Sequence, residues 1–504
     1  MQREIRFTLP VSRKLSGVPS SNRGLNVRWK RMVNVLVLLA LVSAGKIFSQ
    51  AQISSFQHVV IIFQENRTPD NLFQGLCGTD GSLCPIPYDI AQSGTDNLGN
   101  TISLVPVPLS SAYEPVHRHQ NFIALCHLDT KTNQCQMNGM ESKNCNINEC
   151  PYGYVPPSDV VPYTTMAQQY GWSNFMFQTN QGPSAPAHAI IFSGSSAPTA
   201  ADDAAAIFVS EWKDVYGCLT PLNDVYSFIS PQSAPNEYTE INNPLGSFCF
   251  NRDSMATLLD GNDPQTTWKY YTPSAFSIWD AVSWFQGLCE PDPTYTVCTS
   301  AEWANDVDPH PADVLTDIKN CQLRNVVWVI PSIQNSDHAE ATKGSTGGPS
   351  WVSSIVNSVG NSACHDTVNG HKLSYWQDTA IFITWDDWGG WYDHEPPTLL
   401  SKPDKGQGDY QYGFRVPLVV VSAYTPAGYV DNTRSDFGSI LRFVEQNFGI
   451  PEGALNFADA RATSDLTEFF NLSQAPRTFT TISAPKGADF FVQDTRPDEP
   501  PDTD

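Results

Sequence analysis

The strongest chemical signal in this sequence is a pair of adjacent acids, Asp386 and Asp387, at the end of the apolar run 379–385. Two neighbouring carboxylates repel each other unless a proton or a cation lies between them. A Gly-Gly pair and the segment Asp-His-Glu-Pro-Pro (393–397) follow, with three tryptophans and a tyrosine interleaved, which is unlike a solvent-facing acidic turn. We therefore expect Asp386 and Asp387 to bind a metal ion.

A second polar cluster, Gln-Glu-Asn-Arg at 64–67, directly follows the apolar run 58–63. The carboxylate of Glu65 and the amide of Asn66 offer hard oxygen ligands to a divalent cation. The alternative is an ordinary turn, in which Asn66 bonds to the local backbone. The cluster alone does not decide between a metal site and a turn.

Ser184 lies in the segment Gly-Pro-Ser-Ala-Pro-Ala-His (182–188), which is typical of the start of a helix. A hydroxyl at that position faces free backbone N–H groups and the positive end of the helix dipole, which favour a phosphate and an ionised hydroxyl. The alternative is a serine that caps a helix beginning at Ala185 or Pro186.

Two further segments carry histidines beside other polar residues. Asp337 and His338 lie in the polar segment 332–340, where they could bind a metal or a phosphoryl oxygen, or form a solvated loop. His117 and His119 flank Arg118, and one of them could contact a phosphate or a leaving group. The pattern does not distinguish these roles from that of ordinary surface histidines.

The elements that must position these clusters are apolar, β-branched runs at 58–63, 326–330, 379–385 and 416–422. Near-continuous runs of this kind are typical of strands buried on both faces of a parallel sheet. Helical patterns at 312–320, 351–359 and 437–448 alternate with them. The alternation predicts an α/β fold, in which ligands bind beyond the carboxyl ends of the strands.

Two long segments interrupt this alternation and are expected to be insertions over one face of the sheet, at about 77–150 and 200–306. The sequence holds 12 cysteines, an even number with several close pairs, which predicts disulfides formed in an oxidising compartment. Pairing of neighbours (77–84, 126–135, 145–150) fits the spacing, although spacing cannot fix connectivity. The absence of any Cys-x-x-Cys pair disfavours a zinc finger.

Both ends of the sequence differ from the middle. Residues 1–51 combine nine Lys and Arg with the apolar run 33–44 and a Ser-Gln-Ala site, which predicts a secretory signal peptide. The run is shorter than the about 20 residues of a spanning helix. An uncleaved anchor and a start at Met32 remain alternatives. The Pro-rich acidic segment 486–504 is expected to be disordered, which leaves 52–485 as the catalytic body.

The charge of this body restricts its partners. Without the nine basic residues and one acid of 1–51, 20 basic and 51 acidic side chains remain, a formal charge of −31. Such a body repels nucleic acids and anionic membrane surfaces. We expect no nucleic-acid partner and no stable membrane span after signal cleavage. A phosphate-bearing substrate then requires a local positive feature, such as a metal or a helix N-terminus.

Four segments together resemble the bacterial phospholipase C / acid phosphatase phosphoesterase family, a branch related to the alkaline phosphatase superfamily. They are HVVIIFQENRTPDNLF (58–73), QGPSAPAH (181–188), TWDDWGGWYDHEPP (384–397) and YGFRVPLVVVSAYTPAGYV (412–430). The resemblance runs through about 56–475. It implies a doubly wound, mostly parallel α/β core, alkaline phosphatase-like, with one divalent metal ion of unknown identity beside a hydroxyl nucleophile.

The resemblance also implies a role for each residue that matches a motif of the family. The implied metal ligands are Glu65, Asn66, Asp386 and Asp387. The implied nucleophile is Ser184, which would form a phosphoserine, and the further active-site groups are Asp337, His338 and either His117 or His119. The implied substrate contacts are Asn66, His188 and His394. Trp388 departs from the pattern, because many relatives carry a histidine at its position.

The resulting interpretation is an exported, metal-dependent phosphoesterase of the acid phosphatase type, because Ser184 stands where phospholipase-like members often carry threonine. The first alternative is a phospholipase C that cleaves phosphatidylcholine-type diesters. Aromatic residues within 200–306 could line a choline site or belong to the core. They are Trp212, Phe228, Trp268, Tyr270, Trp279 and Trp284. The second alternative is a secreted binding protein without catalytic activity on the same fold.

Overall fold

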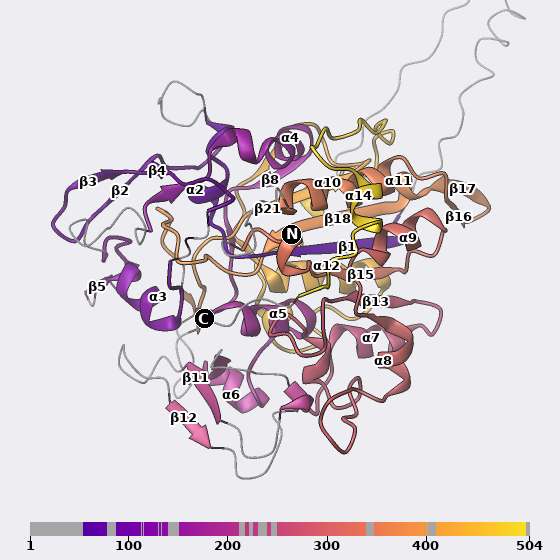
Figure 1. The fold of residues 1–504 in the computed structure, drawn as a ribbon, viewed down its shortest axis with the longest axis horizontal. Coiled ribbons are helices and arrows are strands. Elements are labelled where there is room, and N and C mark those ends of the chain that lie inside the picture. Colours follow the sequence, from indigo (N-terminus) through magenta and orange to yellow (C-terminus); the bar gives the residue numbers. More distant parts are fainter. Residues whose placement is uncertain are drawn as a thin grey trace, which may run out of the picture. The chain divides into compact units, whose positions relative to one another are not determined.

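A mixed sheet of eight strands forms the centre of the computed structural model, in the order β14-β13-β15-β1-β18-β21-β8-β22 (Figure 1). The structure describes residues 54–77, 87–111, 113, 115–129, 131–132, 134–139, 151–210, 217–220, 225–229, 239–242, 249–338, 347–397, 399–401 and 410–499. The predicted signal peptide lies outside these residues. Among the described residues, no helix has both the length and the apolar character to cross a membrane.

The strands of this sheet are mostly parallel, as the sequence predicts. They are β1 (His58–Gln64), β8 (Gly171–Ser173), β13 (Trp268–Tyr271), β14 (Val307–Asp308), β15 (Val326–Val329), β18 (Thr379–Trp385), β21 (Leu418–Ser422) and β22 (Tyr429–Asp431). The exception is β21, which pairs antiparallel with both β18 and β8. Its apolar sequence resembles that of the parallel strands because all of its residues are buried as well.

Helices cover both faces of the sheet, since every residue of β1, β15 and β18 is buried. Helix α10 (Gly347–Gly360) contacts α4 (Val161–Gln169), α9 (Asp313–Lys319) and α14 (Ala488–Val492). A second group consists of α12 (Phe437–Phe448), α5 (Ser184–Ser193) and α13 (Ala458–Arg461). The three helices expected from the sequence are therefore present. Helix α12 begins after Asp436, whose side chain caps the first turn, and it ends before Gly449, which adopts a φ of 71°.

The described part of the predicted insertion at 77–150, together with β7 just after it, forms short strand pairs and a helix. The pairs are β2 (Ser93–Thr95) with β3 (Thr101–Ser103), β4 (Val105–Pro106) with β7 (Gly153–Tyr154), and β5 (Leu128–Asp129) with β6 (Gln134–Cys135). Helix α3 (His119–Cys126) packs its Phe122 into one apolar cluster with Trp388 and Phe414. The insertion thus packs against the segment that follows Asp386-Asp387.

The second predicted insertion, 200–306, is smaller than expected. Its first part forms a separate sheet of β10 (Phe208–Ser210), β11 (Val225–Ile229) and β12 (Thr239–Asn242). However, β13 pairs in parallel with β15 and belongs to the central sheet. The sequence did not indicate this strand because its residues, Trp-Lys-Tyr-Tyr, lack the aliphatic β-branched pattern of the other strands.

Disulfides join cysteines in several parts of the fold, as predicted from their number. The described bonds are Cys126–Cys135, Cys218–Cys249, Cys289–Cys298 and Cys321–Cys364. The expected neighbour pair 126–135 is confirmed. Cys77 is also disulfide-bonded, whereas Cys84 and the pair 145–150 lie outside the described residues.

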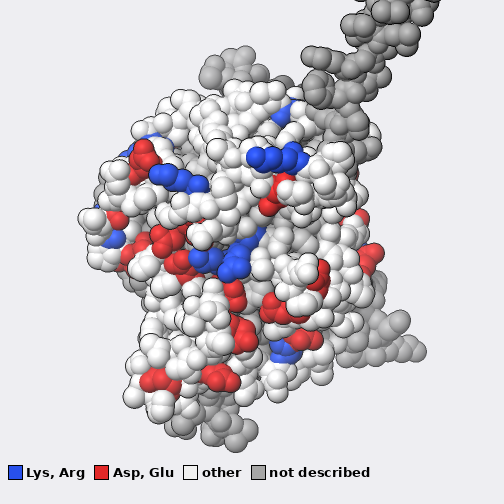
Figure 2. Space-filling view, turned by 90° about the vertical axis from the view of Figure 1, so that its right-hand side faces the viewer, with Lys and Arg blue, Asp and Glu red and all other residues white. Residues whose placement is uncertain are grey.

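The surface carries charges of both signs on the face drawn in Figure 2, where acidic and basic side chains are interspersed.

The C-terminal segment is a correction to the sequence analysis, which predicts disorder for 486–504. Helix α14 lies in this segment, and its Phe491 is 2% exposed and packs its ring 5.3 Å from that of Trp351 on α10. The backbone carbonyl of Glu499 accepts a hydrogen bond from Ile333 N. One buried aromatic contact and one backbone hydrogen bond therefore hold the segment in place as far as residue 499, despite its Pro-rich acidic composition. Residues 500–504 lie outside the described part.

The replacement Phe491→Ala tests whether α14 is part of the fold. We expect it to lower the free energy of unfolding by about 3 kcal/mol, because it removes a buried ring from the contact with Trp351. Phe490→Ala is the matched control, since Phe490 is 40% exposed and should change stability by less than about 0.5 kcal/mol. Equal effects of the two replacements in chemical denaturation would contradict the packing of α14.

Candidate active site

The parallel pairing of β1 and β18 brings two of the predicted clusters together. The register places Gln64 opposite Trp385, so the residues that follow them emerge at the same edge of the sheet. The backbone N–H of Asn66 donates a hydrogen bond of 2.8 Å to Asp386 Oδ1. Asn66 adopts a positive φ of 58°, a conformation that asparagine tolerates better than most residues.

The Gly-Gly turn after Asp387 allows two other backbone segments to approach it. Gly389 and Gly390 have φ values of 60° and 72°. A Cβ atom at Gly389 would overlap the backbone carbonyl of Asn66, and one at Gly390 would overlap Pro115. Glycine is therefore required by both space and conformation at Gly389 and Gly390.

Ser184 is the first residue of α5, and its hydroxyl does not cap the helix. The N-cap is Pro183, and no side chain caps the first turn. Ser184 Oγ lies instead 3.2 Å from Asn66 Oδ1 and 3.2 Å from Asp387 Oδ2, to either of which it can donate its proton. The structure thus favours the chemical interpretation of this serine over the capping one.

His188 lies one helical turn after Ser184, so both side chains project from the same side of α5. Its Nε2 lies 3.1 Å from Glu65 Oε1. Potential ligand atoms of Glu65, His188 and Asp386 all lie within 4.8 Å of one another, and all three residues are buried. Burial lowers the pKa of His188 to about 4, which keeps its imidazole neutral and able to bind a metal.

The donor set of this group fits a divalent cation. Asp386 Oδ2 and His188 Nδ1 are buried and accept or donate no hydrogen bond among the described residues. A buried carboxylate oxygen in this state is unfavourable unless a positive charge faces it. One imidazole and two carboxylates form a set that Zn²⁺ or Mn²⁺ accepts. The sequence analysis assigned His188 to the substrate; its spacing of four residues from Ser184 was the signal that pointed to the same site.

His117 joins this group, which separates it from His119. Its Nε2 lies 3.5 Å from the amide Nδ2 of Asn66 and 3.8 Å from Asp387 Oδ2. His119 has its Nδ1 3.3 Å from the backbone carbonyl of Gln181 instead, and burial lowers its pKa to about 4. Of the two histidines between which the sequence could not choose, His117 is the one beside Asn66 and Asp387.

A model of the phosphoesterase family matches residues 56–451, a range that contains all of these side chains. The chain belongs to the phosphoesterase family. The match covers more than half of the chain and both of the strands that carry the acidic residues.

Curated relatives of this phosphoesterase include phospholipases C. The chain is 23% identical over 444 residues to a non-hemolytic phospholipase C of Pseudomonas aeruginosa, which covers 83% of this chain and 57% of the relative. It is 27% identical over 184 residues to phospholipase C A of Mycobacterium tuberculosis, which covers 33% of each protein. The chain thus spans about a third to somewhat over half of the length of these relatives.

A solved structure of a protein in the alkaline phosphatase superfamily from Vibrio parahaemolyticus also matches this phosphoesterase. The two share 9% sequence identity, the match covers 86% of this chain and 78% of the other, and the TM-score is 0.36. The α/β fold described above rests on the topology of this chain's own sheet and not on that similarity.

Asp337 and His338 take different positions in this phosphoesterase. The Asp337 carboxylate accepts hydrogen bonds from Tyr163 Oη (2.8 Å) and Trp385 Nε1 (3.0 Å), and burial raises its pKa to about 6. These contacts connect α4 to β18 and do not involve Ser184. The ring of His338 lies 6.0 Å from that of Trp279, whose own ring lies 6.3 Å from His188. The rings of His338 and His188 therefore both lie near that of Trp279.

His394, the remaining predicted substrate contact, belongs to another buried network. Its Nδ1 lies 2.8 Å from Asp70 Oδ2, and the nearby carboxylates raise its pKa to about 10 despite its burial. The fully buried Arg415 donates hydrogen bonds of 2.8 and 3.1 Å to Asp393 in the same network. Here an arginine supplies the positive charge that the acids require, and none of these contacts reaches Ser184.

The aromatic residues of 200–306 mostly belong to the core. Trp268, Tyr270 and Trp284 are at most 1% exposed, and the rings of Trp268 and Tyr270 pack against Phe192 of α5. Trp279 is also buried, and Trp212 lies outside the described residues. The core interpretation therefore holds for Trp268, Tyr270 and Trp284.

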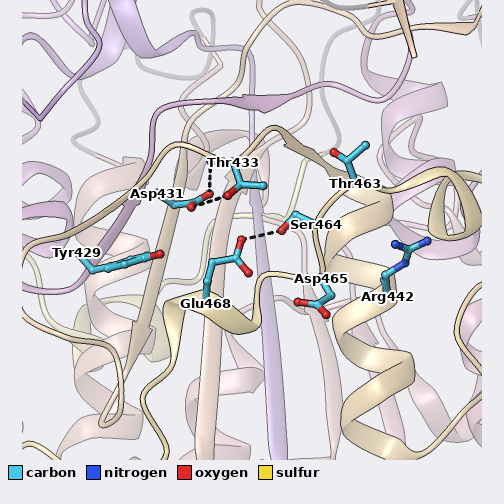
Figure 3. A pocket seen from close by; sticks show the side chains of 8 residues that line it. All are labelled: Tyr429, Asp431, Thr433, Arg442, Thr463, Ser464, Asp465 and Glu468. Atoms are coloured by element: carbon cyan, nitrogen blue, oxygen red, sulfur yellow. Dashed lines mark hydrogen bonds between the residues drawn. The ribbon is translucent and has the colours of Figure 1, made fainter. Parts of the chain in front are cut away.

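An open pocket of about 410 Å³ lies elsewhere, at the sheet edge formed by β22 (Figure 3). It is lined by Tyr429, Asp431, Thr433, Arg442, Thr463, Ser464, Asp465 and Glu468. Its acids already accept hydrogen bonds, Asp431 from Thr433 and Glu468 from Ser464. The pocket contains none of the residues that the sequence singled out.

The replacement Gly389→Ala tests the close approach of the Gly-Gly turn to Asn66. We expect a loss of about 2 kcal/mol or more in unfolding free energy and a loss of phosphoesterase activity, because the methyl group displaces the Asn66 backbone. The control is Gly99→Ala, which has a similar φ of 80° but open space around it. It should cost only about 1 kcal/mol and leave activity intact.

Proposed function

We propose that this chain hydrolyses phosphodiesters of the phospholipid type, as a phospholipase C-like enzyme with Ser184 as its nucleophile. The observation that carries the proposal is the position of Ser184 Oγ, 3.2 Å from both Asn66 Oδ1 and Asp387 Oδ2 at the N-terminus of a buried helix. The helix dipole there favours a bound phosphate in a chain that is otherwise strongly acidic.

In the proposed reaction, Ser184 Oγ forms a bond to phosphorus and its proton passes to Asp387. Gly389 N donates a hydrogen bond of 2.6 Å to Asp387 Oδ1, which holds the carboxylate in place for this transfer. The bond between phosphorus and the ester oxygen breaks. His117, which lies beside Asp387, is positioned to give a proton to the leaving oxygen. Water then attacks the phosphoserine and releases the phosphorylated product.

A divalent cation held by Glu65, His188 and Asp386 would supply positive charge that favours the ionised Ser184 hydroxyl and offsets the charge of the phosphate. The side chains of Asn66 and Asp387, which the sequence analysis also assigned to the metal, lie within hydrogen-bonding distance of Ser184. We propose that they chiefly orient the hydroxyl, and that Asp337 and His394 support the surrounding structure.

The diester substrate is favoured over the monoester by the relatives, which are named as phospholipases C. The sequence analysis preferred the acid phosphatase interpretation because the nucleophile is a serine. That preference rests on one side chain, whereas the similarity to the Pseudomonas aeruginosa relative extends over 444 residues. Both reactions share the same attack by Ser184, and they differ in whether phosphorus carries a second ester.

Export is part of the proposal. Nine cysteines of the described part of the chain are oxidised, namely Cys77 and the eight of the four described bonds, which indicates an oxidising compartment. This agrees with the signal peptide expected from residues 1–51. We propose that the enzyme acts outside the cytoplasm.

The replacement Ser184→Ala tests the nucleophile. We expect the rate of hydrolysis of an aryl phosphodiester to fall by about 10³-fold or more, because no other hydroxyl replaces the one that attacks phosphorus. Ser193→Ala is the matched control at the other end of the same helix, since Ser193 Oγ bonds to the carbonyls of Ala189 and Ser195 and to Arg252 Nη1, and to none of the residues around Ser184. Circular dichroism should show both variants folded, and substantial turnover by Ser184→Ala would exclude the assignment.

A chelator and metal add-back assay tests the cation and the substrate together. Dialysis against EDTA should abolish activity, and one divalent ion should restore it, because the buried acids need a counter-charge. The restored enzyme is given p-nitrophenyl phosphate and phosphatidylcholine vesicles in parallel. Release of phosphocholine at the higher kcat/KM supports the diester proposal, whereas release of inorganic phosphate from the monoester alone would return the acid phosphatase interpretation.

A further inference from the structure

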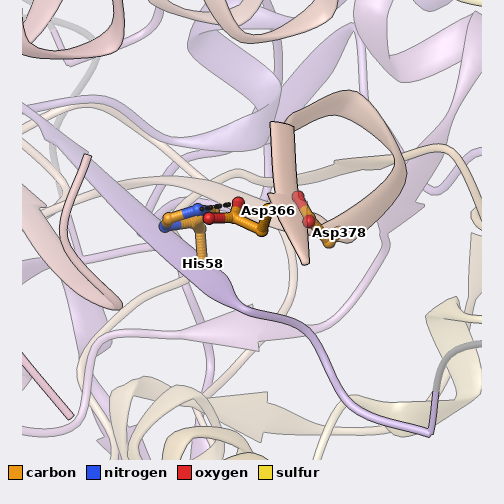
Figure 4. A group of neighbouring side chains, drawn as sticks. All are labelled: His58, Asp366 and Asp378. Atoms are coloured by element: carbon orange, nitrogen blue, oxygen red, sulfur yellow. Dashed lines mark hydrogen bonds and ion pairs between the residues drawn. The ribbon is translucent and has the colours of Figure 1, made fainter. Parts of the chain in front are cut away.

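A second group of residues that could bind a metal lies at the amino end of the central strand β1, at the opposite end of that strand from the active site (Figure 4). It consists of His58, the first residue of β1; Asp366, on the hairpin of β16 (His365–Val368) and β17 (His371–Ser374); and Asp378, which ends α11 (Tyr375–Asp378). Potential ligand atoms of the three residues lie within 4.8 Å of one another. Since β1 spans seven residues, this group lies about 20 Å from the active-site end.

The imidazole of His58 is oriented as in a metal ligand. Its Nδ1 lies 2.8 Å from the backbone carbonyl of Arg324, to which it donates its proton. The other ring nitrogen, Nε2, lies 2.9 Å from Asp366 Oδ2, where it can share a proton with the carboxylate or face a cation. A histidine that binds a metal usually donates its second ring N–H to a carbonyl or carboxylate in this manner. Two acceptor atoms at 2.9 Å require a proton or a cation near them.

Asp378 adds a second carboxylate, which is buried beside that of Asp366. The residue is 0% exposed, and neither of its oxygens forms a hydrogen bond among the described residues. The ion pair of Asp366 with His58 is the one described salt bridge in this group, and no described Lys or Arg pairs with Asp366 or Asp378. A buried carboxylate without a counter-charge is strongly unfavourable.

The network around Arg415 shows the alternative way to satisfy buried acids. There, a guanidinium donates to Asp393 and contacts Asp70, so that the positive charge comes from the protein itself. The His58 group contains two acids and one imidazole. Its two buried carboxylates therefore still need a positive charge close to them.

We propose that His58, Asp366 and Asp378 bind a divalent cation, with Zn²⁺ as the best match, at a structural site distinct from the active site. One nitrogen and two carboxylate ligands suit Zn²⁺, and solvent can supply the fourth ligand. The Asp366 side chain is 33% exposed, which gives the ion a path to the buried His58 and Asp378.

The bound ion would connect three separate segments of the fold. It joins the start of β1, the β16–β17 hairpin and the end of α11, which leads directly into β18. The Cys321–Cys364 disulfide closes the same region, because Cys364 precedes Asp366 by two residues and Cys321 precedes Arg324 by three. A ligand that binds only the folded chain stabilises it, so the site would raise the thermal stability of the sheet.

The test measures bound Zn²⁺ in the full exported chain, first stripped of metal and then equilibrated with Zn²⁺ alone. Wild type should bind one more equivalent than Asp378→Asn, and Asp378→Asn should retain its phosphoesterase activity because the site is remote from Ser184. Asp263→Asn, which alters an acid outside the group, is the control and should bind as wild type does. Equal binding by wild type and Asp378→Asn would overturn the proposal and favour a proton shared between Asp366 and Asp378.

A second measurement isolates the site from the active-site metal. In the Asp386→Asn background, Zn²⁺ should raise Tm by on the order of 3–5 °C, and the additional change Asp378→Asn should remove this shift. If Asp378 is instead a protonated acid, asparagine replaces it without a change in charge. The Asp386→Asn variant and the Asp386→Asn/Asp378→Asn double variant should then show the same change in Tm with Zn²⁺, which would contradict the proposal. The outcome for Zn²⁺ does not depend on the proposed reaction, since neither the Zn²⁺ binding nor the Tm measurement uses a phosphate substrate.

Discussion

The parallel contact between β1 and β18 places buried ionisable side chains together at both ends of the two strands. At the carboxyl ends, Glu65 and Asp386 emerge side by side, and at the amino ends, His58 lies beside the segment of Asp378. The strands are held in register by a backbone ladder and by seven fully buried side chains on each. The acids therefore cannot separate to relieve their repulsion, and each end of the pair must be neutralised locally.

The surrounding structure solves this electrostatic problem in more than one way. The Arg415 network uses a buried guanidinium, and Asp337 is stabilised by neutral donors, Tyr163 and Trp385. At Ser184 the fold adds the N-terminus of α5, whose dipole is positive where the hydroxyl lies. A chain with a net charge of −23 can thus attract an anionic substrate, provided that the attraction is confined to one strand edge.

The sequence predicts the central strands and the acidic clusters well because both depend on local patterns. The run 379–385 coincides with β18, and the run 437–448 coincides with α12. Contacts between distant segments could not be predicted. His394 stands in the same motif as Asp386, but Asp70, which is 324 residues away in sequence, holds it in a different network. The partnership of His188 with Glu65 likewise depends on where α5 begins, which the sequence analysis placed at Ala185 or Pro186 and the structure places at Ser184.

The order of the strands along the chain has a consequence for folding kinetics. Asn66 and Asp386 are 320 residues apart, so the site is a product of contacts with high sequence separation. Contacts of this kind carry a large loop-closure entropy and form late, which slows folding. During synthesis, β1 emerges long before β15 and β18, the two strands that cover its edges. A nascent chain with this order exposes an apolar strand for most of its translation, so chaperone binding, or translocation before folding, would protect it from aggregation.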